Sequence, residues 1–319
     1  MSIAAYIKVI GRGKDGARPL DATQSEDLLG QILDGGVSDL EIGAFCLAMR
    51  IKGETAAELD GFVKATLARS LPLPRATAAA TSTGVVILPS YNGARKLPNL
   101  TPLLAWSLSR RGVKVLVHGP LQDPTRVTSA QLFQAASLPV VTSDAELAAA
   151  WLADRPAFLP IETLCPALAR LLAVRWTIGL RNPGHTVAKL LDPFAQATGP
   201  GPRTVRVVNH THPEYAYSLS EYLQRTGARA LLMRGTEGEP VADARRQPRF
   251  EVFVQGARQA ALSQAPEDGV LTALPALPEN CTAEATVTYM QAVMAGDAPL
   301  PDAIQTQVDC LIQTLHCDI

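Results

Sequence analysis

The strongest constraint on the fold of this chain is a series of short apolar runs separated by longer helical stretches. Runs at 85–88, 113–117, 205–208, 230–233 and 250–254 have the length and the Val-rich or aromatic content of buried strands. The segments between them are long enough for the helical crossovers that parallel strands require. The sequence therefore predicts an α/β fold with a mainly parallel sheet.

The first 70 residues show a different pattern, with three helix-start signatures in which Ser or Thr precedes Glu by three residues. These pairs are Thr23–Glu26, Ser38–Glu41 and Thr55–Glu58. In each pair the hydroxyl and the carboxylate can both satisfy backbone N–H groups that the helix leaves unpaired. The pattern predicts a small helical unit, and the Pro- and Ala-rich stretch 71–80 predicts a linker after it.

Composition narrows the possible partners and compartments. The chain has 319 residues, enough for one large domain and a smaller one, and its formal net charge is −1. With this net charge, the chain as a whole does not attract nucleic acid electrostatically, so any basic surface must be local. The five cysteines, an odd number with no C-x-x-C pair, favour free thiols in a reducing cytoplasm. With no signal-peptide pattern and no apolar run near ~20 residues, we expect a cytoplasmic protein without a membrane segment.

Residues 89–119 have the layout of a phosphate-binding site in an α/β domain. A loop leads into a helix that begins near Thr101, and the next strand stops at His118 and Gly119. The loop nevertheless contains a single glycine, Gly93, and begins with a proline. Phosphate cradles depend on backbone N–H groups at close approach, which glycine permits and proline reduces.

The stretch 35–62 resembles the N-terminal helical domain of the anthranilate phosphoribosyltransferase family, and the resemblance continues from about residue 20 to 255. That family has a G-T-G-G-D loop, then N-x-S-T, then a strand that ends in K-H-G-N. Here 99–102 and 117–120 match the last two motifs in part, and the separation from Asn99 to His118 (118 − 99 = 19) is the family's spacing.

The resemblance implies a nucleoside phosphorylase/phosphoribosyltransferase-like fold, with a small N-terminal helical domain and a large α/β domain. It places the helical domain at 1–72 with 164–191 and the α/β domain at 73–163 with 192–319. It also implies a homodimer that forms through the helical domain.

The departures from the family fall on its chemistry. The glycine-rich loop aligns with 89–93, where Tyr91 adds a ring and the loop's aspartate is missing. The family's D-G-L-D-E segment, whose acidic pair holds magnesium on the diphosphate, aligns with 234–241. The pair is replaced by a proline and a valine, which offer magnesium no side-chain oxygen, although Glu237 and Glu239 lie beside it.

The acceptor side of the site departs as well. The family's arginine that contacts the anthranilate carboxylate aligns with His185, and Lys189 replaces an asparagine. Together these substitutions resemble the YbiB-type branch of the family, which is associated with binding nucleic acid. The resemblance implies a nucleic-acid-binding protein. The joint departures predict that it lacks phosphoribosyltransferase activity with anthranilate. With no recognisable groove-reading helix, binding should be largely independent of sequence, and stacking of Tyr91 on a base would favour single strands.

On this hypothesis no residue is catalytic, no metal or other cofactor is needed, and basic groups with Tyr91 contact the strand. The residues assigned to nucleic-acid binding are Tyr91, Asn92, Arg95, Lys96, Arg181, Lys189, Arg245 and Arg246. The residues assigned to the former substrate cleft are Ser90, Gly93, Asn99, Thr101, His118, Gly119, His185, Glu237 and Glu239.

The residues leave several alternatives open. An active glycosyltransferase with an altered acceptor, either for phosphoribosyl transfer or for nucleoside phosphorolysis, would use magnesium. Arg245 and Arg246 could extend a basic groove or merely pair with the acidic residues before them. A zinc site at His210 and His212 is disfavoured because no third ligand lies nearby in the sequence.

Overall fold

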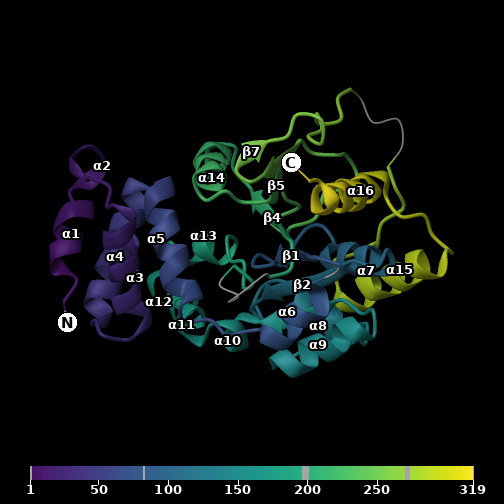
Figure 1. Ribbon diagram of the computed structural model, residues 1–319, viewed down its shortest axis with the longest axis horizontal. Helices are drawn as coiled ribbons and strands as arrows, with labels where there is room; N and C mark the ends of the chain where they lie inside the picture. The colour runs from purple at the N-terminus through teal and green to yellow at the C-terminus, as the bar shows by residue number, and fades with distance from the viewer. Residues whose placement is uncertain (1, 82, 196–200, 270–273, 319) are drawn as a thin grey trace.

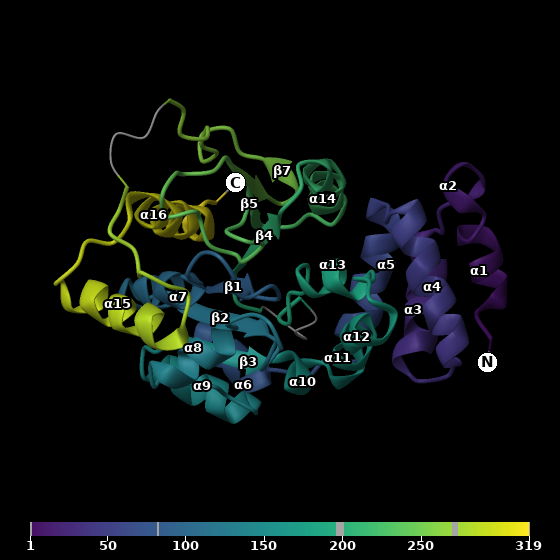
Figure 2. The same ribbon diagram turned by 180° about the vertical axis from the view of Figure 1, so that it is seen from behind.

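The computed structural model describes residues 2–81, 83–195, 201–269 and 274–318. Figure 1 shows two parts side by side: the N-terminal helices form one end of the molecule, and a sheet with its flanking helices forms the other. The opposite view in Figure 2 shows the same separation, with the stretch 161–188 between the two parts. Within the described residues, no helix combines the length and the apolar character that a membrane crossing needs.

The helical unit draws on two separate segments of the chain. Its helices are α1 (Ala4–Ile10), α2 (Gly13–Gly16), α3 (Ala22–Leu33), α4 (Asp39–Lys52), α5 (Ala56–Leu67), α11 (Pro166–Ala173), α12 (Arg175–Ile178) and α13 (Gly184–Ala188). Helices α3 and α5 pack closely on each other through buried apolar side chains. The later helices α11 and α13 pack against α3 and α5, so the unit closes only when the chain returns to it from the sheet.

Two of the three expected helix starts are confirmed and one is wrong. Ser38 with Glu41 begins α4, and Thr55 with Glu58 begins α5, each as a reciprocal capping box. Helix α3 instead begins at Asp21, whose carboxylate accepts from the backbone N–H of Gln24. The buried Glu58 carboxylate also accepts from the backbone N–H of Leu20 at 3.0 Å. This bond fixes the residue just before the N-cap of α3.

The sheet has seven strands in the order β3-β2-β1-β4-β5-β6-β7. The strands are β1 (Val85–Pro89), β2 (Lys114–Gly119), β3 (Ala157–Pro160), β4 (Thr204–His210), β5 (Ala230–Arg234), β6 (Phe250–Val254) and β7 (Ala257–Arg258). The first five in chain order pair in parallel, and β6 and β7 pair antiparallel at one edge. The predicted α/β fold with a mainly parallel sheet is confirmed.

Helices cover both faces of the sheet, as a buried parallel sheet requires. One face packs against α6 (Pro74–Ala80), α9 (Asp144–Leu152) and α14 (Glu214–Arg225), with α10 (Ile161–Leu164) following β3. The other face packs against α7 (Thr101–Arg110), α8 (Ser129–Ala135), α15 (Ala283–Ala295) and α16 (Asp302–His316). Neighbouring residues of β1 alternate between the two cores: Val85 and Ile87 belong to the first, Val86 and Leu88 to the second.

The expectation that residues 71–80 form a linker is wrong, because most of this stretch is helix α6. The N-terminus of α6 is capped from far away in the sequence: the carboxylate of Asp144 accepts from the backbone N–H groups of Arg75 and Ala76, both at 2.9 Å. Ala76 and Ala80 are fully buried against α9. A distant carboxylate thus supplies the cap that the local sequence lacks.

The parallel strands bring their carboxyl ends to one edge of the sheet, where ligands bind in open α/β folds. The loops that follow β1, β2, β4 and β5 begin at residues 90, 120, 211 and 235. The helical unit lies next to this edge. The fold therefore places residues from both parts around one cleft.

Candidate functional site

A cleft of about 620 Å³ lies between the end of α4 and the carboxyl edge of the sheet. Its polar walls carry four cationic side chains from four different segments: Arg50, Arg126, Arg181 and Lys189. The other lining residues are Met49, Gly53, Glu54, Asn92, Asn182, Pro183, His185, Thr186, Asn209, His210, Thr211, His212, Glu214, Tyr215, Leu219 and Glu237.

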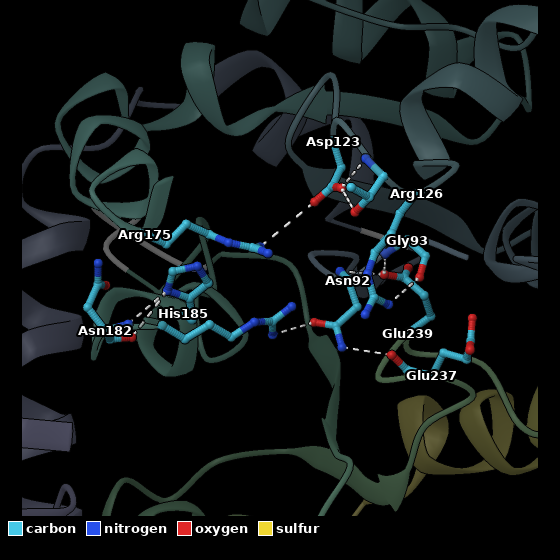
Figure 3. A network of polar contacts seen from close by, with 11 residues as sticks. Asn92, Gly93, Asp123, Arg126, Arg175, Asn182, His185, Glu237 and Glu239 are labelled. Atoms are coloured by element: carbon cyan, nitrogen blue, oxygen red, sulfur yellow. Dashed lines mark hydrogen bonds and ion pairs between the residues drawn. The ribbon is translucent and has the colours of Figure 1, made fainter. Parts of the chain in front are cut away.

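At the floor of this region, the loop after β1 still forms an anion cradle, and the chain fills it with its own carboxylate (Figure 3). The backbone N–H groups of Asn92 and Gly93 donate to Oε1 of Glu239 at 2.6 and 2.7 Å. The hydroxyl of Ser90 donates to Oε2, and the hydroxyl of Thr101 lies 3.3 Å from the same oxygen. Glu239 is 1% exposed, so this carboxylate is enclosed by donors on both oxygens.

A second carboxylate of the same loop binds the next part of the chain. Glu237 accepts from the backbone N–H groups of Arg95 and Lys96 at 2.6 and 3.0 Å, and its carbonyl accepts from the Asn92 amide at 2.7 Å. The side chains of Arg95 and Lys96 are exposed, but they are not among the described residues that line the cleft. The loop after β5 is thus fastened to the loop after β1 at two successive points.

Close packing explains two of the glycines in this region. Gly238 has a φ of +87°, and a Cβ there would lie 1.9 Å from the Asn92 amide nitrogen. A Cβ on Gly119 would lie 1.8 Å from the carbonyl oxygen of Ser90. Both contacts are far inside van der Waals distance, so these positions need glycine for the two loops to meet.

Arg181, Lys189 and Arg126 converge on the Asn92 loop. Arg181 donates to Asn92 Oδ1 at 2.8 Å, and Arg126 donates to the carbonyl of Gly93 at 3.3 Å. Lys189 Nζ donates to Asn209 Oδ1 at 2.9 Å and to the carbonyl of Gly238 at 3.0 Å. Their partners are neutral oxygens, and among the described residues none of the three cations forms a direct ion pair with a carboxylate.

The electrostatics of these cations reflect their crowding. Burial, and then the charges of Arg175 and Arg126, lower the pKa of Arg181 to about 10. Burial, and then Arg181, lower the pKa of Lys189 to about 8. Both groups are protonated at neutral pH at an energetic cost, which a bound anion would reduce.

Tyr91 is buried, which corrects the expectation that its ring stacks on a base. Only 5% of the residue is exposed, and its hydroxyl lies 2.7 Å from Nδ1 of His118. The two rings meet edge to face, with centroids 5.5 Å apart. Burial lowers the pKa of His118 to about 3, so the imidazole is neutral and the pair is part of the core. At 5% exposure the ring of Tyr91 does not present a face on which a base could stack.

Asn99 and Ser90 support the loop from within, whereas His185 lines the cleft. The Asn99 amide donates to the Ser129 hydroxyl at 3.0 Å, and the Ser129 hydroxyl lies 2.7 Å from that of Ser90. His185 Nδ1 lies 3.2 Å from the carbonyl of Asn182, and burial lowers the His185 pKa to about 3. The hydroxyl and amide contacts form a chain of neutral groups that ends at the carboxylate of Glu239.

Arg245 and Arg246 are exposed and are not among the described residues that line the cleft. Arg245 pairs with Asp243 at 2.7 Å, and Arg246 donates to the carbonyl of Gly269 at 2.6 Å. The structure therefore favours the alternative in which Arg245 serves a local ion pair. Sequence reasoning missed Arg50 and Arg126, for which the only signal was the position of Arg126 after the strand end at Gly119.

The donor set does not fit the magnesium ion that a diphosphate-handling site would need. Both oxygens of Glu239 already accept hydrogen bonds, and the next two residues are proline and valine. Within the described ranges, no three His, Cys, Asp or Glu side chains gather in a way that could hold a metal ion.

Comparisons with known proteins agree with this geometry. Residues 5–70 match the family described as glycosyl transferase family, helical bundle domain. The protein YbiB of Escherichia coli (strain K12), which is described as uncharacterized, is 36% identical over 98% of this chain and 94% of its own length. The anthranilate phosphoribosyltransferase of Acidothermus cellulolyticus is 26% identical over 90% of this chain and 78% of its own length.

Solved structures show the same fold. The anthranilate phosphoribosyltransferase of Thermus thermophilus superposes with a TM-score of 0.68 at 18% identity, over 97% of this chain and 95% of that one. The enzyme of Saccharomyces cerevisiae, solved in complex with PRPP and Mg, superposes with a TM-score of 0.67 at 15% identity, over 99% of this chain and 88% of that one.

Proposed function

Since this chain belongs to the anthranilate phosphoribosyltransferase-like family, we propose that it uses the family's scaffold to bind nucleic acid in the cleft between its two parts, without transferring phosphoribose. The observation that best supports this proposal is that the carboxylate of Glu239 occupies the anion-binding site of the loop after β1. The binding is mainly to phosphates and largely independent of sequence, because no described basic helix is arranged to enter a groove and contact base edges.

Glu239 opposes diphosphate binding in two ways. It occupies the backbone N–H groups of Asn92 and Gly93, which a phosphate would need. It would also repel a phosphate brought to those same donors: two unit charges 4 Å apart interact by about 4 kcal/mol at an effective dielectric constant of 20. A donor substrate such as PRPP, which occurs in the related yeast structure, would have to displace a buried, fully hydrogen-bonded carboxylate.

The cations around the cleft supply the attraction for a polyanion. Arg181, Lys189 and Arg126 donate hydrogen bonds to neutral oxygens, so their charges are available to phosphates. Three carboxylates also line the cleft, but burial raises the pKa of Glu54, and backbone N–H groups engage Glu237. Because the net charge of the chain is −1, binding of a nucleic acid requires a local positive surface of this kind.

A homodimer through the helical unit completes the proposal. Helix α4 carries three exposed apolar side chains: Leu40, Leu47 and Ile51 are 84%, 51% and 51% exposed. Their spacing places them along one side of the helix. A second copy packed against this side would shield these side chains. Two clefts in one particle could then hold one long strand, which raises the apparent affinity.

The second candidate is an active glycosyltransferase with an altered acceptor. One observation favours it: the volume of about 620 Å³ is that of a small-molecule site. It requires an acceptor and a sugar donor that bind without displacing Glu239, because the diphosphate cradle is occupied.

The deciding experiment is a titration of labelled single-stranded oligonucleotide at several salt concentrations. We expect binding that weakens steeply with salt, each neutralised phosphate adding roughly 0.7 to the log–log slope on single strands. Lys189→Glu and Arg181→Glu should weaken binding of every sequence alike. Arg246→Glu is the matched control, since it reverses an exposed charge away from the cleft.

The parallel assay follows turnover of phosphoribosyl diphosphate with anthranilate, for which we expect no activity above background. Absence of oligonucleotide binding at low salt, or equal loss in Arg246→Glu and Lys189→Glu, would contradict the nucleic-acid proposal. Steady turnover with anthranilate would establish the enzymatic alternative.

A further inference from the structure

We propose that Trp176, backed by Arg175, is the platform on which a base of the bound single strand stacks. This inference rests on the proposed function, and it assigns to Trp176 the role that the burial of Tyr91 rules out. The Trp176 side chain belongs to α12, lines a second hollow that shares His185 with the cleft, and is 52% exposed. Large exposed aromatic rings are rare on this chain: among the described residues, Tyr217 is the other one.

The ring is held in place by its neighbour. The guanidinium of Arg175 lies 4.2 Å from the centroid of the Trp176 ring, within the range of a cation–π contact. Arg175 is itself fixed by Asp123, 3.8 Å away on the loop after β2 (Figure 3). One face of the indole is therefore covered by a cation, and the exposed half of its surface is left for a partner.

A hollow lies against this ring. It encloses about 110 Å³. Its walls include Trp176, Arg175, Gln122 and His185, together with the buried Tyr91 and the carboxylates of Asp123 and Glu162. His185 also lines the larger cleft, so the hollow and the cleft lie on two sides of the same side chain. A nucleic-acid strand bound in the cleft could thus place one base past His185 against the indole. Its phosphates would still contact the cations of the cleft.

Charge complementarity favours a nucleic acid over a purely apolar partner. Figure 3 shows Arg175 and Arg126 in one polar network with Asn92, to which Arg181 donates at 2.8 Å. Three guanidinium groups thus share this region with the carboxylates of Asp123 and Glu239. Phosphates fit among these groups, and the aromatic ring then takes a base, because every base has a π-face. The combination of a basic track and an exposed aromatic is typical of single-strand binding without sequence preference.

The local backbone explains why a tryptophan is exposed here. Val174 and Ile178 pack against the core of the helical unit, while Trp176, between them, points away from it. Helix α12 ends at Gly179, whose φ of +72° turns the chain back toward Arg181. The chain thus passes from the indole at 176 to the cleft residue Arg181 within five residues.

The test compares two labelled oligomers of equal length and charge, one of thymidines and one with abasic sites throughout. We expect wild type to bind the thymidine oligomer roughly tenfold more tightly than the abasic one. Trp176→Ala should bind both equally and keep the wild-type affinity for the abasic oligomer, while Trp176→Phe should keep most of the preference. Tyr217→Ala is the matched control, because Tyr217 is an exposed aromatic that lines neither the cleft nor the hollow beside Trp176.

Intrinsic fluorescence supplies a second measurement that does not depend on affinity. Stacking should quench the emission of wild type on binding, and the quenching should be absent in Trp176→Phe. Equal affinity of wild type for both oligomers, or quenching that persists in Trp176→Phe, would overturn the platform while leaving the phosphate-binding proposal intact. A monomer for Trp176→Ala beside a dimer for wild type would also overturn it, because the ring would then belong to an interface. Binding of neither oligomer by wild type would instead overturn the proposed function itself.

Discussion

The carboxylate of Glu239 and the backbone N–H of Gly93 meet at 2.7 Å, although 146 residues separate them in the chain. The position of that carboxylate is the position of a bound anion at a phosphate loop. The loop therefore keeps the geometry of an anion cradle even though it has lost the glycines and the aspartate of the related enzymes. It is stabilised by an internal group instead of a ligand.

Removal of the internal anion should open the cradle. Glu239→Ala leaves the N–H groups of Asn92 and Gly93 and the hydroxyl of Ser90 without their acceptor, which should lower the free energy of unfolding by about 2–4 kcal/mol. Added inorganic phosphate should restore part of that loss in Glu239→Ala by binding the folded state. Thermal melting with increasing phosphate measures both effects, and Glu239→Gln, which keeps an acceptor oxygen, is the control. Equal phosphate effects on wild type and Glu239→Ala would contradict the prediction.

Acid should destabilise the protein through its buried histidines. The pKa of His118 is about 3 in the folded protein against 6.5 ordinarily, so the unfolded state binds more protons between these values. Stability from His118 is fully present above pH 6.5 and is lost as the pH falls toward 3. From pH 6.5 to 5 this amounts to about 2 kcal/mol. Denaturant unfolding at both pH values measures the free energy of unfolding. Between pH 6.5 and 5 this free energy should fall less in His118→Gln than in wild type. In the control His316→Gln, at an exposed site, it should fall as much as in wild type.

Nucleic-acid affinity should depend on the protonation of Lys189. Its pKa is lowered to about 8, so the cation that contacts a phosphate is lost as the pH rises above that value, whereas Arg181, with a pKa of about 10, stays charged longer. We expect wild-type affinity to fall several-fold between pH 7 and pH 9 at constant salt. Lys189→Arg should remove this decline because arginine stays protonated. Fluorescence anisotropy titrations check it, and identical pH profiles for the two proteins would refute the role of Lys189.

The exposed side of α4 should control the oligomeric state. Leu47→Glu places a charge on the side that Leu40 and Ile51 share, and it should convert a dimer into a monomer that remains folded. Leu152→Glu on α9, where Leu152 is 75% exposed, is the control that should leave the dimer intact. Light scattering at micromolar concentration measures the mass. A wild-type monomer, or a dimer that survives Leu47→Glu, would contradict a dimer through this side.

The sequence by itself determined what depends on neighbours along the chain. The pairs Ser38–Glu41 and Thr55–Glu58 predict their helix starts because each cap is made within three residues. The apolar runs predict the strands and a mainly parallel sheet, since burial on both faces and the length of the crossovers are visible in the sequence. The run 250–254 is the exception, because it pairs antiparallel. The lost glycine loop and the lost acidic pair were equally visible there.

Only the tertiary structure decided what depends on contacts between distant segments. Asp144 caps α6 from 68 and 69 residues away, which turns an expected linker into a helix. Tyr91 turns inward to Nδ1 of His118, and Glu239 enters the Asn92 loop across 147 residues. Local patterns carry no information about these partners, because hydrogen-bond donors in a loop bind whichever acceptor the fold brings within about 3 Å. The fold also gathered Arg126, Arg181 and Lys189 around one cleft, and so determined where the charge of this nearly neutral chain can act.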